Sequence, residues 1–280
     1  MIPSLQLAAA QFMFAALCQQ HYLTHLMSNI QIQLEQQILT ITMARADKYN
    51  ALTPQMYGAM ANALESVKEE NKAKAVLIQG EGKHFSAGND LSTFASIDKE
   101  DTSSETVRFM NALMDCPVPV VAKVRGQAVG IGTTLLLHCD LVFADDSATL
   151  CMPFINLALV PEFAASWVLP KLSGHVKAAE WLMLGEPIPA QEAYQYKLVN
   201  RIVEAEKLDS HVDAIMTKLA LKPGLAMRHT KALLKHEQES VKAHMAEELD
   251  IFFSQLTTEP AKEAFAAFLE KRAPDPKKFN

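Results

Sequence analysis

Short apolar runs alternate with helical segments from residue 30 onward, and this alternation constrains the fold more than any other feature of the chain. The first two runs, IQIQLE and ILTITMA, alternate apolar and polar residues and predict a pair of strands. Two later runs, AVLIQG and VVAKV, are mostly apolar, as strands buried on both faces are, and DLVFAD is predicted to be a further strand. Helical segments separate these runs, so the sequence predicts an α/β fold with βαβ units and a mainly parallel sheet.

The helical segments carry start and stop signals of their own. Thr53 before Pro54 predicts an N-cap followed by proline at the first helical position. Gly185 is predicted to end the helix VKAAEWLML. From Leu208 onward the chain is predicted to be helical, and the apolar faces in FFSQL and AFAAFLE need a partner surface, for which a neighbouring subunit is one candidate.

Composition and charge narrow the class of protein. The 280 residues are 49% hydrophobic, which is enough to bury a core in one large domain, or in one domain with an appendage. The formal net charge is −6 and no long basic run occurs, which argues against a nucleic-acid partner or an anionic membrane surface. The four cysteines show no C-x-x-C spacing, so we expect reduced thiols in a cytoplasmic protein.

Residues 1–28 precede the first predicted strand. Their apolar run is interrupted by Gln11, and no Lys or Arg precedes Arg45, so the charged segment of a signal peptide is missing. The run is too short to span a bilayer. We expect a poorly packed helical extension or a non-native start, with a helix that docks on a partner as the alternative. His21 and His25 lie four apart, but HYLTH lacks the Glu of a metalloprotease motif, so no metal site is expected.

Two glycine loops follow predicted buried strands, and neither fits a phosphate-binding motif. GEGKH resembles the end of a Walker A sequence, but Leu77 and His84 stand where that motif needs Gly and Ser or Thr. The GIG of the second loop begins a dinucleotide fingerprint, but Leu135 replaces the third glycine.

The same two loops suit an oxyanion hole. The second loop opens a predicted helix, whose first N–H groups lack intrahelical partners and lie at the positive end of the helix dipole. One free N–H from each loop can bind an oxygen that becomes negatively charged during a reaction. The glycines also suit simple turns and close helix–strand contacts, and the pattern alone does not choose between the two interpretations.

Three separated motifs point to a known family. HFSAGNDL, VRGQAVGIGTTLLLHCDLVFA and PFINLALVPEF occur in the order and spacing of the enoyl-CoA hydratase/isomerase (crotonase) superfamily, which the chain resembles over roughly residues 30–275. The resemblance implies the crotonase (ClpP-like) fold, a spiral of ββα units with a C-terminal helical trimerisation region. We therefore expect an extension at 1–28, a core at 29–210 and a helical region at 211–280, in a homotrimer or a dimer of trimers.

The resemblance also implies roles for individual residues. The two oxyanion N–H groups would belong to Asn89 and Ile131. Ala87 and Asn89 would flank the adenine end and pantetheine arm of coenzyme A, and Lys48 and Ala51 match the segment that helps to hold the nucleotide. Further substrate-binding positions implied by the resemblance are Gly88, Asp90, Leu91, Gly130, Gly132, Thr134 and Phe154.

Two departures from the family pattern bear on the chemistry. Hydratases of the family use two glutamates, and Thr134 and Phe154 occupy their places here. Adding water to a double bond needs a carboxylate to activate water and an acid to protonate carbon. Efficient hydration is therefore not expected.

Glu162 is the carboxylate that remains near these motifs. Its place in LVPEF is similar to that of the single catalytic Glu in the Δ3,Δ2-enoyl-CoA isomerase branch, particularly the peroxisomal type. Apolar neighbours can raise the pKa of a carboxyl group toward neutrality. An exposed loop carboxylate is the alternative.

We therefore predict a fatty-acid β-oxidation enzyme that moves a 3-enoyl-CoA double bond to the 2-trans position. Glu162 would take a proton from C2 and deliver one to C4, while the two N–H groups stabilise the dienolate oxygen. Coenzyme A is part of the substrate, and no metal or redox cofactor is expected. Two alternatives remain: a hydratase or another acyl-CoA lyase or hydrolase of this fold, and a non-catalytic acyl-CoA-binding protein.

Overall fold

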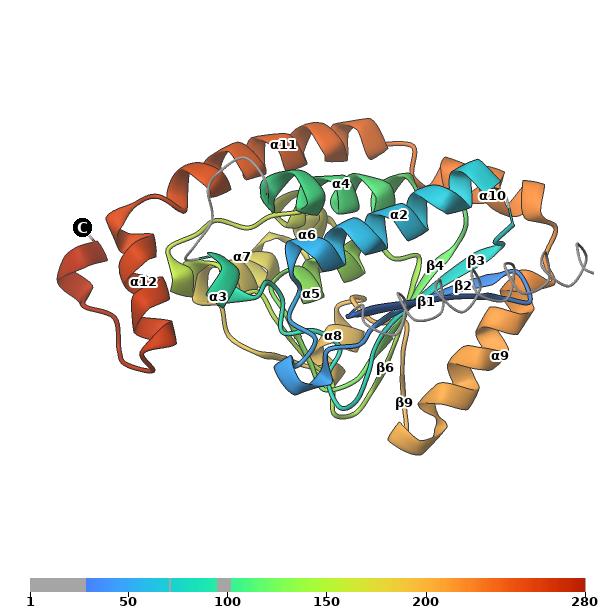
Figure 1. Ribbon diagram of the computed structural model, residues 1–280, viewed down its shortest axis with the longest axis horizontal. Helices are drawn as coiled ribbons and strands as arrows, with labels where there is room; N and C mark the ends of the chain where they lie inside the picture. Colours follow the sequence, from blue (N-terminus) through green and yellow to red (C-terminus); the bar gives the residue numbers. More distant parts are fainter. Residues whose placement is uncertain (1–28, 71, 95–101, 280) are drawn as a thin grey trace, which may run out of the picture.

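The main sheet contains six strands in the order β1-β2-β3-β4-β6-β9 (Figure 1). The computed structural model describes residues 29–70, 72–94 and 102–279, so the expectations for residues 1–28, including His21 and His25, lie outside the described residues. The strands are β1 (Ile30–Glu35), β2 (Ile38–Met43), β3 (Ala75–Gly80), β4 (Val120–Val124), β6 (Leu141–Asp145) and β9 (Arg201–Val203).

Strand direction in this sheet follows the prediction. β1 and β2 form an antiparallel hairpin, and its turn residues Gln36 and Gln37 have φ values of 49° and 64°, as a type I′ turn requires. Every later neighbour pair, from β2–β3 to β6–β9, is parallel. The predicted βαβ arrangement with a mainly parallel sheet is confirmed.

Helices cover both faces of the main sheet. α2 (Pro54–Glu70) and α4 (Thr102–Asp115) lie side by side over one face, and α9 (Leu208–Ala220) lies against the other (Figure 1). Alternate residues of β3 separate accordingly, because successive strand side chains point to opposite faces. Val76 and Ile78 join the core that contains α2 and α4, whereas Ala75 and Leu77 join the core under α9.

A second, smaller sheet makes the spiral. It contains β5 (Gln127–Val129), β7 (Thr149–Cys151) and β8 (Ile188–Pro189). The chain passes from β4 to β5 and from β6 to β7, and the segment after β3 joins the same layer through a parallel bridge between Ser86 and Ala128. Each turn of the spiral therefore supplies a long strand, a short strand and then a helix or loop.

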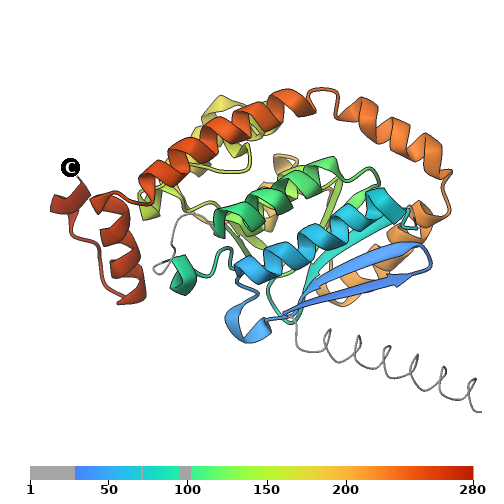
Figure 2. The same ribbon diagram turned by 45° about the horizontal axis from the view of Figure 1, so that its top comes forward.

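Further helices, most of them short, lie between the strands of the two sheets and lead to the C-terminal region. They are η1 (Ala46–Lys48), α3 (Leu91–Phe94), α5 (Ile131–Thr134), η2 (Leu135–His138), η3 (Ile155–Leu157), α6 (Ala165–Ser173), α7 (His175–Leu184), α8 (Ala190–Gln195) and η4 (Ala205–Lys207). The remaining helices are α10 (Gly224–Leu234), α11 (Gln238–Gln255), α12 (Glu259–Leu269) and η5 (Pro276–Phe279). α11 runs along one side of the molecule from α10 to α12 (Figures 1 and 2).

Local signals in the sequence have clear structural counterparts. Thr53 Oγ1 accepts the Met56 N–H at 3.4 Å at the start of α2. Gly185 ends α7 with φ 63°, and its N–H donates to the Trp181 carbonyl. The expected division after residue 210 falls inside α9, which packs on the main sheet, so the helices free of that sheet begin with α10.

No helix in the described ranges is both long enough and apolar enough to cross a membrane.

Candidate active site

The first predicted loop presents the backbone of Asn89. Leu52 donates its N–H to the Gly88 carbonyl at 2.7 Å, and Asp90 donates its N–H to the Leu52 carbonyl at 2.9 Å. In this parallel bridge the neighbours of Asn89 make the hydrogen bonds, so its own N–H points away from Leu52. Within the described residues, the Asn89 N–H has no hydrogen-bond acceptor.

The second predicted loop presents the backbone of Ile131. Gly130 donates its N–H to the Cys151 carbonyl, and its own carbonyl accepts the N–H groups of Thr133 and Thr134. Ile131 is the first residue of α5, and in the part of the chain that the structure describes its N–H has no acceptor. Each loop thus contributes one unused backbone donor.

Glycine lets these two loops lie directly against each other. Gly88 has φ 82°, and a Cβ added there would lie 2.5 Å from the Val129 carbonyl oxygen. A Cβ on Gly132 would lie 2.8 Å from the Ser86 carbonyl oxygen. The Val129 N–H donates to that same Ser86 carbonyl at 2.9 Å, so the loops are joined by hydrogen bonds as well as by close packing.

A cavity of about 350 Å³ lies in front of these donors. Its wall combines both loops with apolar side chains of η3, α11 and α12. The predicted site residues that line it are Ala87, Gly88, Asn89, Leu91, Gly130, Ile131 and Phe154. The predicted residues that do not line it are Lys48, Ala51, Asp90, Gly132, Thr134 and Glu162.

Glu162 is buried, with 1% of its surface exposed, as its apolar neighbours predicted. Thr134 Oγ1 donates to Glu162 Oε1 at 3.3 Å. Burial is the main reason that the pKa of Glu162 is raised from 4.5 to about 8; the hydrogen bond from Thr134 opposes this rise, and the Glu248 carboxylate adds to it. A carboxyl group with such a pKa can accept and return a proton near neutral pH.

Tyr57 of α2 bonds to the first loop and lies within electrostatic range of Glu162, and no sequence signal marked it. Its hydroxyl donates to Asn89 Oδ1 at 2.5 Å. Burial, and then the nearby charge of Glu162, raise the pKa of Tyr57 well above its ordinary value. Because Tyr57 occupies an apolar position of an amphipathic helix, it resembles an ordinary core residue in the sequence.

The turn after Glu162 is held in an uncommon conformation. Phe163 and Ala164 have φ values of 59° and 55°, the left-handed region that non-glycine residues rarely occupy. His138 Nε2 donates to the Phe163 carbonyl at 2.6 Å, and the two rings stack with centroids 4.1 Å apart. Burial lowers the pKa of His138 to about 3, against the opposing effect of that hydrogen bond, so the imidazole stays neutral. The neutral His138 side chain therefore supports the turn through Phe163, which is a structural role.

Arg45 links Asp90 and Ala51 beside the first loop. Arg45 Nη1 donates to Asp90 Oδ2 at 2.6 Å and to the Ala51 carbonyl at 3.0 Å. Burial raises the pKa of Asp90, but its hydrogen bonds with Ser92 and Arg45 outweigh burial and leave that pKa below its ordinary value. Lys48 is exposed at the end of η1.

Asn50 and Ser86 hold the first loop from behind, and both were missed in the sequence. Asn50 is fully buried, and its amide donates to the carbonyls of Glu81 and His84 at 3.0 and 2.8 Å. Ser86 Oγ donates to the Asn50 carbonyl and accepts the Gly88 N–H at 3.1 Å. The available signal was the position of Asn50 in KYNAL, because Asn tolerates the left-handed backbone that it adopts here, with φ 57°.

Among the described residues, no group of three or more His, Cys, Asp or Glu side chains is arranged to hold a metal ion.

Comparisons with known proteins show which family the chain is similar to. A family model described as enoyl-CoA hydratase/isomerase matches residues 33–278. The peroxisomal enoyl-CoA delta isomerase 3 of Mus musculus is 34% identical over 253 residues, which are 88% of this chain and 79% of that protein. The 2,3-dehydroadipyl-CoA hydratase of Escherichia coli K12 is 30% identical over 251 residues, which are 89% of this chain and 98% of that protein.

A solved structure supports the same relationship. The enoyl-CoA hydratase/isomerase from Pseudoalteromonas atlantica T6c superposes with a TM-score of 0.84 at 35% identity. The alignment covers 89% of this chain and 99% of that structure.

Proposed function

The chain belongs to the enoyl-CoA hydratase/isomerase family and has its fold, and we propose that it is a Δ3,Δ2-enoyl-CoA isomerase. The observation that carries this proposal is Glu162, a buried carboxyl group bonded to the threonine that takes the place of the first hydratase glutamate. Its pKa of about 8 suits a group that both removes and returns a proton near neutral pH.

The proposed reaction uses three groups of this chain. The Glu162 carboxylate takes a proton from C2 of a 3-enoyl thioester, and the electrons move onto the thioester oxygen as a dienolate. The N–H groups of Asn89 and Ile131 donate to that oxygen and stabilise its charge. Glu162 then gives its proton to C4, and the double bond forms between C2 and C3, so the carboxylate is regenerated without water, metal or redox cofactor.

The cavity supplies the binding surface for this reaction. Both donors line it, together with apolar side chains suited to an acyl chain. Glu162 is not among the lining residues, so we expect an acyl chain to displace part of the wall when it binds. The proposed substrate is therefore an acyl-CoA thioester.

The assay that tests the proposal is conversion of a 3-enoyl-CoA ester to the 2-trans isomer. Glu162→Gln removes the proton acceptor and retains most of the side-chain shape, so kcat is expected to fall by about 100-fold or more. Glu186→Gln is the matched control, because Glu186 is an exposed carboxylate, and it should retain wild-type kcat. Normal isomerisation by Glu162→Gln would rule out the proposed role.

Hydration is the second candidate, because the E. coli relative is named a hydratase and aligns over nearly its full length. Two observations disfavour it. Thr134 Oγ1 is already bonded to Glu162, and the Phe154 ring packs against Phe252 with centroids 6.4 Å apart. We expect water addition to crotonyl-CoA to be very slow. A non-catalytic acyl-CoA-binding protein would instead show no deuterium exchange at C2 in heavy water.

The cytoplasm is our proposed compartment, although one relative is named as peroxisomal. A fluorescent fusion viewed in its native cell tests this location.

A further inference from the structure

A second buried carboxylate, Glu248 of α11, lies behind the proposed catalytic turn. It is 6% exposed, and its Oε1 accepts both the Ser166 N–H at 2.9 Å and the Ser166 hydroxyl at 2.5 Å. Ser166 is the second residue of α6, so Glu248 satisfies a backbone donor in the first turn of that helix. The Glu248 Oε2 atom has no hydrogen-bond partner within the described residues.

His244 completes this cluster on the solvent side. Its Nε2 lies 2.8 Å from Ser166 Oγ and 3.6 Å from Glu248 Oε1. A serine hydroxyl carries one hydrogen, which here goes to Glu248, so His244 Nε2–H donates to Ser166 Oγ. The His244 side chain is 28% exposed, and Nδ1 is 3.9 Å from Glu247 on the outer face of α11.

The cluster is connected to Glu162 through the start of α6. Ala165 donates its N–H to the Glu162 carbonyl at 3.1 Å, and Ser166 follows directly. Phe163 and Ala164 between them have left-handed backbone, which costs free energy and persists only where neighbouring contacts hold it. Glu248 supplies such a contact from α11, and His138 supplies another from η2.

The two carboxylates have opposite surroundings. Glu248 lies at the N-terminus of α6 and accepts two hydrogen bonds from Ser166. Glu162 receives a single long hydrogen bond, from Thr134 on α5, and lies within electrostatic range of Tyr57 on α2 and Glu248 on α11. Pairs of acidic groups held in different environments commonly divide the roles in proton-transfer sites.

We propose that Glu248 is a positioning residue for the isomerisation proposed above: it anchors the first turn of α6 behind Glu162 through its two hydrogen bonds with Ser166. The Glu248 carboxylate also adds to the rise in the pKa of Glu162, which favours the protonated form of Glu162. Retention of that proton serves the reaction, because the proton taken from C2 must stay on Glu162 until C4 receives it. Glu248 acts through Glu162 and α6, without contact to the thioester.

The first experiment follows the Glu162 carboxyl carbon by ¹³C NMR during a pH titration of the full chain, with the signal assigned by its loss in Glu162→Gln. Glu248→Gln keeps an oxygen acceptor for Ser166 but removes the charge. The pKa of Glu162 is expected to fall by roughly half a unit or more in this variant. Glu247→Gln, which removes an exposed charge one residue away, should leave that pKa within about 0.2 unit of wild type because exposed charges are screened.

A second variant guards against misfolding of Glu248→Gln. His244→Lys places a permanent positive charge beside Glu248 at a partly exposed position, and it should move the Glu162 pKa downward as well. If both variants fold and leave the Glu162 titration unchanged, Glu248 does not influence Glu162 and the inference is overturned.

Kinetics separate this inference from the isomerase proposal. In an active enzyme, the acidic limb of the kcat/KM profile should move to lower pH in Glu248→Gln by the same amount as the NMR midpoint. If the wild-type chain isomerises no 3-enoyl-CoA ester, the isomerase proposal fails, while the NMR titration still decides whether Glu248 acts on Glu162. An active wild type with an unshifted Glu248→Gln profile overturns the positioning role alone.

Discussion

At the residue scale, burial of Glu162 makes folding stability depend on pH. The ordinary pKa of the group is 4.5, and in the folded protein it is about 8. Between these values the unfolded chain has lost the proton while the folded chain keeps it, so this group's contribution to stability falls as pH rises. A functional base held in an apolar site is therefore expected to destabilise the fold at neutral pH.

Glu162→Gln should remove this penalty. The stability of the variant relative to wild type is expected to increase between pH 5 and pH 8, by on the order of a few kcal/mol across the whole window. Urea unfolding of both proteins at a series of pH values measures the difference. A constant difference across the window would show that folding does not raise the pKa of Glu162.

Gly88 and Gly130 offer a comparison of two kinds of strain. Both have positive φ, 82° and 55°, but a Cβ on Gly88 meets the Val129 carbonyl at 2.5 Å, whereas a Cβ on Gly130 meets nothing within 4 Å. Gly88→Ala must push the two loops apart, whereas Gly130→Ala meets no neighbouring atom and costs only the backbone strain of its φ 55° and ψ −122° conformation, about 1–3 kcal/mol.

We therefore expect kcat to fall at least tenfold more in Gly88→Ala than in Gly130→Ala, because a displaced donor stabilises the dienolate poorly. Isomerisation kinetics and thermal unfolding of both variants provide the measurement. Equal losses of kcat would mean that contact between the loops does not set the donor geometry.

At the element scale, sequence periodicity could predict the long strands and helices but not the smallest ones. β5 and β8 have three and two residues, too few for an alternation to show. α6 was not predicted because Pro170 interrupts its helical pattern. The hydrogen bond from the Ser166 N–H to Glu248 of α11 could not be predicted either, because the two residues are 82 positions apart in the chain. The loop glycines were recognisable, whereas Tyr57 depends on a tertiary contact with Asn89.

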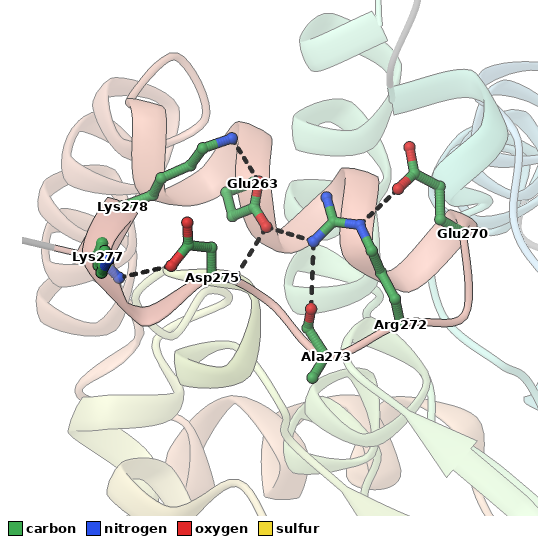
Figure 3. A network of polar contacts seen from close by, with 7 residues as sticks. All are labelled: Glu263, Glu270, Arg272, Ala273, Asp275, Lys277 and Lys278. Carbon is green, nitrogen blue, oxygen red and sulfur yellow. Dashed lines mark hydrogen bonds and ion pairs between the residues drawn. The ribbon is translucent and has the colours of Figure 1, made fainter.

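The C-terminal segment is held against the cavity by an ionic network centred on Glu263 of α12 (Figure 3). Its carboxylate accepts from Arg272 Nη1 at 2.5 Å, from Lys278 Nζ at 2.8 Å and from the Asp275 N–H at 2.9 Å. Arg272 first, then Lys278 and the Asp275 N–H, hold the pKa of Glu263 well below its ordinary value. Arg272 and Pro274 line the cavity, so this network shapes part of the cavity wall.

Glu263→Gln should loosen this segment and raise KM for an acyl-CoA ester by roughly 5- to 10-fold, with little change in kcat. Because the folded pKa is depressed, the stabilisation is present above the ordinary value of 4.5 and is lost as pH falls below it. Amide exchange in residues 270–279 measures the loosening.

Glu270→Gln is the matched control for this network. Glu270 also bonds Arg272, but its side chain is 60% exposed and it makes no bond to Lys278. It should change KM by less than about twofold, since exposed ion pairs contribute little. A KM effect as large as that of Glu263→Gln would show that the buried carboxylate is not the centre of the network.

At the scale of the whole molecule, the sequence predicted a fold that the structure has, since three motifs fixed the order of the loops around one spiral. Successive turns of this spiral bring Asn89, Ile131 and Glu162 to one region, although they are separated by dozens of residues. What could not be predicted is the packing between turns. Carboxyl burial, the Tyr57–Asn89 bond and the Glu248 anchor all depend on side chains meeting across different elements.

The helix α10 exposes large apolar side chains, which bears on whether copies of the chain associate. Leu225, Leu233 and Leu234 are 71%, 76% and 78% exposed. Contiguous apolar surface of more than a few hundred Å² is uncommon on monomers and marks association sites. Burying it between copies would stabilise an assembly by roughly 25 cal/mol for each Å² removed from water. The exposed leucines predict association through this helical region, and the resemblance to the family implies that the assembly is a homotrimer or a pair of trimers.

Leu225→Lys combined with Leu233→Lys should dissociate the assembly, because each lysine would have to lose its hydration at the contact. Light scattering after size-exclusion chromatography measures the mass, with three or six times 30.9 kDa expected for the wild type and a lower mass for the double variant. Leu34→Lys on the edge strand β1, where the leucine is 44% exposed, should keep the wild-type mass. A monomeric wild-type protein would contradict the prediction and leave the α10 surface to another partner.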